Sequence, residues 1–119
     1  MMMSHTLDQD ALVITVHDDP GVDRRAALLA EIGDLVQGYR PASVVVVLDE
    51  SAATEAALSV VLRAHRLCSR LGLVMSVATR SAPARRRLEA DADTRGVRLV
   101  IHARADTAIA TATALTAAA

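Results

Sequence analysis

Histidine, serine and acidic side chains could all do chemistry in this chain, but few of them have the spacing of a known catalytic or metal site. The four histidines lie on separate segments without an acidic partner at motif spacing: His5, His17, His65 and His102. The five glycines are isolated, so no glycine-rich phosphate loop occurs, and no nucleophile elbow or paired metal-ligand motif is present. We therefore predict no catalytic residue, no metal site and no cofactor. A metal held by His17 and His102 at two strand ends is a minor alternative.

Acidic residues follow two predicted strands and offer a second kind of chemistry. Asp18 and Asp19 come after the first strand, and Asp49 comes after the central one. A phospho-aspartate receiver domain has such a cluster, which holds a magnesium ion and accepts phosphate on the residue that matches Asp49. Receivers also need a lysine to neutralise the phosphoryl group, and this chain contains none. They have, in addition, a further strand and helix between the two acidic segments, so this interpretation is the less favoured one.

The composition indicates one folded domain and excludes several classes of protein. The chain has 119 residues, 52% of them hydrophobic, and its mean hydropathy of +0.30 at a net charge of -1 is typical of a folded chain. Thirteen arginines balance fourteen acidic residues, and Tyr39 is the one aromatic residue, which argues against nucleic-acid binding. Apolar runs such as Val44–Leu48 are far shorter than the ~20 residues of a membrane span, and no signal-peptide core is visible. We expect a cytoplasmic protein that binds no membrane.

The single cysteine, Cys68, excludes an internal disulfide. It lies on the apolar face of a predicted helix, where a free cysteine usually acts as a small buried hydrophobe.

Strands and helices are expected to alternate along the chain. Period-two and β-branched runs predict strands at Ala11–His17, Ser43–Leu48, Leu73–Thr79 and Val97–His102. Helical periodicity and capping residues predict helices at Val22–Tyr39, Thr54–Leu71, about 81–90 and about 106–115. We expect one α/β domain over residues 11–116, preceded by a disordered or partly ordered segment at 1–10 and followed by a frayed tail at 117–119. Its sheet should be mixed, with about four to five strands and about four helices, and binding residues should follow His17, Leu48 and Thr79.

The stretch from the central strand to the next strand is the most informative one. Val44–Leu48 is followed by Asp49-Glu50-Ser51, then by the helical segment Leu58–Arg66 and by Arg70-Leu71-Gly72 before the next strand. This order resembles the STAS family, the bacterial anti-sigma-factor antagonists and their sulphate-transporter relatives. In that family a buried strand ends in Leu-Asp, a loop leads to a helix, and a leucine-glycine turn enters the next strand. The resemblance continues through Ser81–Glu89 to the helix at Asp106, and it implies a STAS-like fold.

The resemblance also locates the family's regulatory serine, which accepts phosphate in a segment of the type Asp-Ser-Ser-Gly just before the second helix. Here Thr54-Glu55-Ala56-Ala57 matches that segment, and the phosphoacceptor falls on Ala56, which has no hydroxyl. The usual serine switch is therefore predicted to be lost. Ser51 and Thr54 are nearby hydroxyls that could substitute as phosphoacceptors, although helix capping is the favoured interpretation of both.

Charged residues near this helix are the predicted contacts of a partner protein. Glu55 falls in the first helical turn, where the helix dipole favours a carboxylate, and it could also imitate a fixed phosphoserine. Asp23 approximately matches the acidic residue that opens the family's first helix. The surface implied by the resemblance consists of Asp23, Asp49, Glu50, Glu55, Ser59 and Arg63.

The predicted function is non-enzymatic regulation of bacterial transcription. By resemblance, the domain acts as an anti-sigma-factor antagonist that binds a GHKL-type ATP-binding anti-sigma factor kinase, or a related regulatory protein, without the usual serine phosphorylation. The alternative is a degenerate STAS-like scaffold or homodimerisation module. In that case Arg63, Arg66 and Arg70 are a solvated stripe on the second helix.

Overall fold

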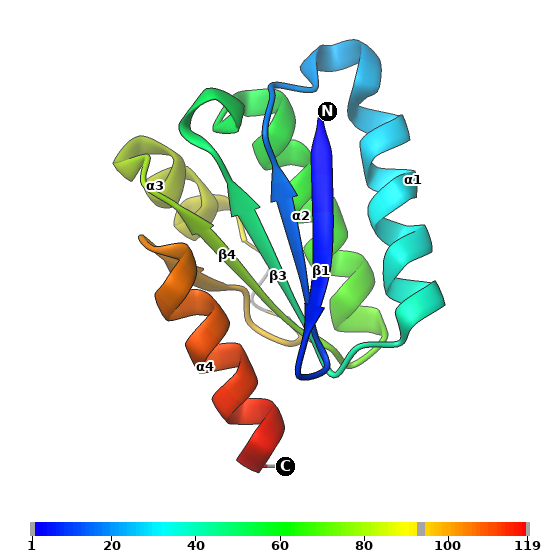
Figure 1. Ribbon diagram of the computed structural model, residues 1–119. Helices are drawn as coiled ribbons and strands as arrows, with labels where there is room; N and C mark the ends of the chain where they lie inside the picture. Colours follow the sequence, from blue (N-terminus) through cyan, green and yellow to red (C-terminus); the bar gives the residue numbers. More distant parts are fainter. Residues whose placement is uncertain (1, 93–94, 119) are drawn as a thin grey trace.

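A five-stranded mixed sheet forms the centre of the molecule in the computed structural model, which describes residues 2–92 and 95–118 (Figure 1). Its strands follow the chain order and are β1 Met3–Asp8, β2 Ala11–Val16, β3 Ser43–Leu48, β4 Val74–Thr79 and β5 Val100–His102. β1 is antiparallel to β2, and the other pairs are parallel. The predicted α/β fold with a mixed sheet is confirmed.

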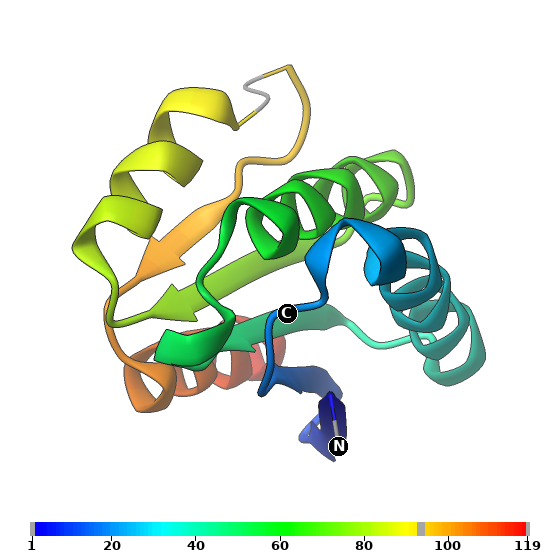
Figure 2. The ribbon, with the colours of Figure 1, turned by 90° about the horizontal axis from the view of Figure 1, so that it is seen from above.

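Four α-helices cover the two faces of the sheet unequally. They are α1 Gly21–Tyr39, α2 Glu55–Arg70, α3 Ala82–Asp91 and α4 Ala105–Ala118. The three crossover helices α1, α2 and α3 pack on one face, and α4 lies alone on the other (Figure 2). In the described part of the chain, none of the helices combines the length and the apolar sequence that crossing a membrane demands.

The N-terminal segment is ordered beyond what the sequence predicted. We expected a disordered or partly ordered segment at residues 1–10, whereas β1 pairs with the whole of β2, from Met3 opposite Val16 to Asp8 opposite Ala11. Gln9 and Asp10 form the connection with φ values of 48° and 68°, as a two-residue hairpin turn requires. Such turns usually contain glycine or asparagine, so the sequence Gln9-Asp10 did not predict a hairpin. The domain therefore begins before residue 11.

The predicted frayed tail at 117–119 overlaps the last residues of α4, which ends at Ala118, and Ala119 lies outside the described residues.

The core consists of two apolar layers of different character. Towards α1–α3, the sheet contributes branched and long side chains such as Val44, Val46 and Met75. Towards α4 the layer is smaller, with Val45 of β3 packed among alanines. The alternation along β3 follows from the period of two of a strand, and it confirms that both faces of this strand are covered.

β5 is shorter than the predicted strand Val97–His102. The peptide groups of Val97 bind α2 instead of β4: the His65 Nε2–H donates to the Val97 carbonyl over 2.6 Å, and the Val97 N–H donates to Ser69 Oγ over 3.0 Å. Because those groups are already satisfied, the strand ladder starts only at Val100.

Cys68 lies inside the core on α2, with 0% of its surface exposed, and burial raises the pKa of its thiol to about 11. The thiolate is the reactive form, and a free cysteine has a pKa of about 8.5. At pH 8 we therefore expect iodoacetamide to alkylate the folded protein at least about 100-fold more slowly than the urea-unfolded chain. Timed alkylation followed by intact-mass spectrometry measures both rates, and equal rates would contradict the buried position.

Candidate functional site

The candidate site lies at the carboxyl edge of the parallel strands, where the first turn of α2 begins. α2 starts at Glu55 because Thr54 caps it, and the Thr54 Oγ1 accepts a hydrogen bond from the Ala57 N–H over 3.3 Å. The same hydroxyl donates to Asp19 Oδ1 over 2.7 Å. The capping interpretation of Thr54 is thus confirmed, and its hydroxyl proton is engaged as well.

Asp19 connects the loops in front of α1 and α2. Its Oδ1 accepts from the Gly21 N–H over 2.9 Å and from the Thr54 hydroxyl. Gly21 has a φ of 63°, which glycine adopts without strain. The hydrogen bond from Gly21, followed by that from Thr54, lowers the pKa of the Asp19 carboxyl below its usual range. One carboxylate therefore fixes the starts of both helices relative to each other.

Asp19 predicts a specific dependence of stability on pH. A carboxyl whose pKa is lower in the folded state stabilises the fold above its unfolded pKa of about 3.9, and this contribution is lost as the pH falls through the folded pKa. We expect Asp19→Asn, which keeps an acceptor oxygen but does not titrate, to be less stable than the wild type at pH 6. The difference should shrink as the pH falls through the lowered pKa that Asp19 has in the folded state. Urea unfolding midpoints from pH 2 to 6 measure it, and parallel profiles for the two proteins would contradict the role of Asp19.

A chain of hydrogen bonds joins the ends of β1, β2 and β3. His17 Nδ1 lies 2.9 Å from Asp49 Oδ2, and its Nε2 lies 2.8 Å from the hydroxyl of Ser4. Ser51 donates to the His17 carbonyl over 2.8 Å. The order serine, histidine, aspartate is also that of hydrolase triads, in which the serine faces a substrate pocket. The depression at this edge is instead lined by Asp49 together with the ends of β4 and β5. We therefore interpret these hydrogen bonds as structural contacts that hold the strand ends together.

Ala56, the position that matches the phosphoacceptor, and Ser59, a predicted partner contact, both lie in the first half of α2. Ala56 is the second residue of α2 and is half-buried, and Ser59 lies one turn further along the same helix. Ser51 and Thr54, the two candidate substitutes, each donate their hydroxyl proton to a structural acceptor.

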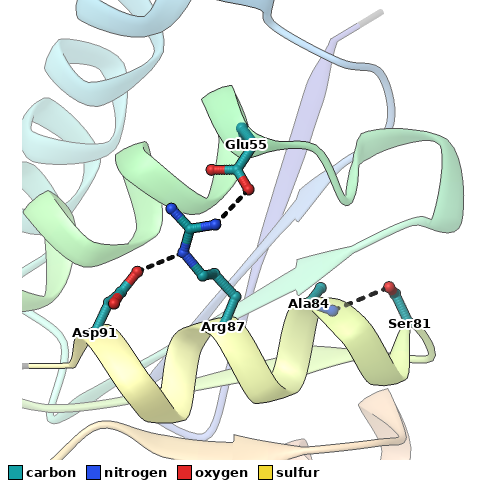
Figure 3. A network of polar contacts seen from close by, with 5 residues as sticks. All are labelled: Glu55, Ser81, Ala84, Arg87 and Asp91. Atoms are coloured by element: carbon teal, nitrogen blue, oxygen red, sulfur yellow. Dashed lines mark hydrogen bonds and ion pairs between the residues drawn. The ribbon is translucent and has the colours of Figure 1, made fainter.

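Glu55 pairs with a residue that the sequence analysis did not select. Arg87 of α3 donates from Nη1 to Glu55 Oε1 over 2.7 Å and from Nε to Asp91 Oδ2 over 2.6 Å (Figure 3). Ser81 caps α3 by accepting from the Ala84 N–H, which sets the start of the helix that carries Arg87. The spacing of Arg87 and Asp91 is a helical pair visible in the sequence, but its link to Glu55 spans 32 residues and carries no sequence signal. All three side chains are largely exposed, so the network is a surface feature.

The remaining predicted contact residues fall on two parts of the surface. Asp23 is exposed in the first turn of α1, and Glu50 is exposed in the single 3-10 turn η1, Glu50–Ala52. Glu55, Ser59 and Arg63 recur every four residues and so share one face of α2. Arg63 nevertheless lies about 12 Å along the axis from Glu55 at the usual helical rise. It lines a separate depression with arginines of the second half of α2.

The receiver interpretation is wrong. Receivers have the strand order 2-1-3-4-5 with helices on both faces, whereas this sheet follows the chain order and begins with an antiparallel strand. Asp19 accepts a hydrogen bond from Thr54, and Asp49 is hydrogen-bonded to His17, so the two carboxylates have separate side-chain partners.

The histidine metal alternative is also wrong. β2 and β5 are three strand spacings apart, about 14 Å, which is too far for His17 and His102 to share an ion. Within residues 2–92 and 95–118, no three histidine, cysteine or acidic side chains converge as a metal site requires.

Comparison with known proteins concerns the fold. No protein-family profile and no curated protein matches the sequence. A solved structure from Thermotoga maritima, described as an anti-sigma factor antagonist, has a TM-score of 0.69 at 14% identity over 92% of this chain and 93% of its own. A serine-to-glutamate variant of RsbS from Moorella thermoacetica has a TM-score of 0.69 at 18% identity over 97% of each chain. At these identities the likeness shows the fold alone: the chain has the fold of these two proteins, as the sequence resemblance to the STAS family predicts.

Proposed function

We propose that this domain is a non-enzymatic protein-binding module of the anti-sigma-factor-antagonist kind. Its partner would be an ATP-binding anti-sigma factor kinase, and binding would free a sigma factor for transcription. The observation that carries the proposal is the exposed polar surface at the start of α2, which the Thr54–Asp19 hydrogen bond holds rigidly against α1. A described antagonist with the same fold supports it.

The proposed contact surface is acidic at its centre. Asp49, Glu50 and Glu55 follow β3 in one continuous segment, and Asp23 comes from the neighbouring helix α1. Ser59 and Arg63 continue the surface along α2. Rigid backbone and complementary charge are what a specific, steered protein contact needs, so a partner with basic residues in its binding site fits best.

We further propose that serine phosphorylation does not switch this binding. Ala56 has no hydroxyl at the position that matches the family phosphoacceptor. Phosphorylating Thr54 would remove the proton that it donates to Asp19 and place like charge beside that carboxylate, and phosphorylating Ser51 would remove its bond to the His17 carbonyl. Each modification would therefore disrupt the local fold in addition to adding charge.

The binding experiment uses the cognate anti-sigma factor with ATP and measures affinity by biolayer interferometry. Glu50→Arg reverses an exposed charge within the surface, and we expect it to weaken binding by at least about tenfold. Glu31→Arg makes the same charge change on the exposed part of α1 and should leave the affinity unchanged. Equal affinities for both variants, or recovery of only this chain from the mixture, would favour the scaffold or homodimer alternative.

The phosphorylation experiment mixes the same kinase, ATP and the protein and maps phosphate by mass spectrometry. We expect the wild type to remain unmodified and Ala56→Ser to gain phosphate at residue 56. Stoichiometric phosphate on Ser51 or Thr54 of the wild type would overturn the unswitched proposal.

A further inference from the structure

A second polar depression lies along the second half of α2, and it shares Arg63 with the proposed partner surface. It has a volume of about 550 Å³ and is lined by Arg63, His65, Arg66, Ser69, Arg70, Arg95 and Gly96. Among the described residues that line it, four are arginines and none carries a carboxylate. Depressions of this volume accommodate small molecules.

The segment that carries Arg95 is fixed against α2. His65 and Ser69, one turn apart, hold both peptide groups of Val97, and the Nε2–O and N–Oγ distances are 2.6 Å and 3.0 Å. Gly96 fits beneath this pair because it has no side chain: an added Cβ would collide with Ser69 Oγ. Arg95 is thereby brought to the arginines of the second half of α2, although it lies 25 residues beyond Arg70 in the sequence.

Three arginines of α2 have no anionic partner among the described residues. Within residues 2–92 and 95–118, the side chains of Arg63, Arg66 and Arg70 form no hydrogen bond or ion pair. By contrast, Arg87 and Arg104 elsewhere on the surface each bind carboxylates. Unpaired guanidinium groups that line one depression create a concentrated positive field.

One further polar group in the depression can donate to an anion. Ser69 accepts the Val97 N–H, so its own hydroxyl proton remains available to donate to a ligand. The buried ring of His65 positions the segment: its Nε2–H donates to the Val97 carbonyl, which leaves Nδ1 as an acceptor that does not bind an anion.

We propose that this arginine depression, defined by its seven lining residues, binds a small phosphorylated anion. Guanidinium forks match the oxygen geometry of phosphate, and several arginines together match the charge of a diphosphate better than that of a single carboxylate. The Ser69 hydroxyl adds a neutral donor beside them. Arg63 also belongs to the proposed partner surface, so the test uses Arg66 and Arg70, which lie outside that surface.

The test is isothermal titration calorimetry of the full chain with sodium pyrophosphate, with citrate as a polyanion that lacks phosphate. We expect saturable 1:1 binding of pyrophosphate and at least tenfold weaker binding of citrate. Arg66→Gln combined with Arg70→Gln should weaken pyrophosphate binding at least tenfold, because both residues line the depression. Arg24→Gln combined with Arg25→Gln removes the same charge from the start of α1 and should bind like the wild type.

Three outcomes would overturn the proposal: no saturable binding, equal binding of citrate and pyrophosphate, or equal weakening in the two double variants. The last result would indicate attraction by net charge alone. Circular dichroism melts of both double variants establish that each is folded, and Ser69→Thr, which keeps the hydroxyl, provides a milder variant of the same depression. If pyrophosphate binds in this depression, the changes that it causes in the backbone amide NMR shifts of the protein should concentrate on residues 63–70 and 95–97.

Discussion

Ala108→Asp is expected to destabilise the protein by at least about 3 kcal/mol, a large part of the 5–15 kcal/mol that holds a typical domain together. Ala108 is 0% exposed where α4 meets the sheet, in the apolar layer that contains Val45 and Ala78. A carboxylate at this position is too short to reach water and has no cationic partner in that layer. Its burial therefore costs several kcal/mol, which detachment of α4 would relieve.

The measurement for Ala108→Asp is urea unfolding followed by circular dichroism at pH 7. Ala110→Asp makes the same change two residues further along α4 at an exposed position, so it should cost no more than about 0.7 kcal/mol in helix propensity. A similar loss in both variants would mean that α4 does not pack on the sheet through Ala108.

Leu88→Ala is expected to cost about 3 kcal/mol, within the range of 2–5 kcal/mol found for buried leucines. Leu88 is 0% exposed and, with Ala84, joins α3 to the main core. The truncation removes apolar contacts and leaves a cavity under a helix of only ten residues. The exposed neighbour Arg87 should then lose its fixed position relative to Glu55.

Two readouts test the Leu88 prediction. Urea unfolding gives the loss of stability, and the matched control Leu115→Ala should change it little because Leu115 is 54% exposed. Amide hydrogen exchange should speed up over α3 more than over α1 in the Leu88 variant. Uniform acceleration throughout the sheet would contradict a local anchoring role.

The element order was predictable because each parallel strand and each helix of this chain carries its own local signal. Valine runs marked β3, and Thr54 and Ser81 marked the starts of two helices as side-chain caps. β1 was missed because its turn uses Gln9, which is unusual at a positive φ. β5 was predicted too long because the groups that bind Val97 in place of β4, the His65 Nε2–H donor and the Ser69 Oγ acceptor, are distant from it in sequence.

The candidate site was predictable in its location but not in its connections. Strand ends in a parallel sheet must meet at one edge, so Asp49 and Thr54 could be placed there from the sequence. The pairing of Glu55 with Arg87, and of Thr54 with Asp19, depends on side chains 32 and 35 residues apart. Likewise, the sequence predicted only an exposed stripe of arginines on α2, because it gave no sign that Arg95 lies beside them in the fold.

The hairpin of β1 and β2 decides which end of the chain suits a reporter or an affinity tag. The Met2 carbonyl accepts the His17 N–H over 2.7 Å, so the first described residues emerge beside the loops of the candidate site. α4 descends from that edge and ends at the opposite end of the sheet (Figure 1). A label fused after α4 would stay clear of a docking partner, whereas one fused before β1 would compete with it for space.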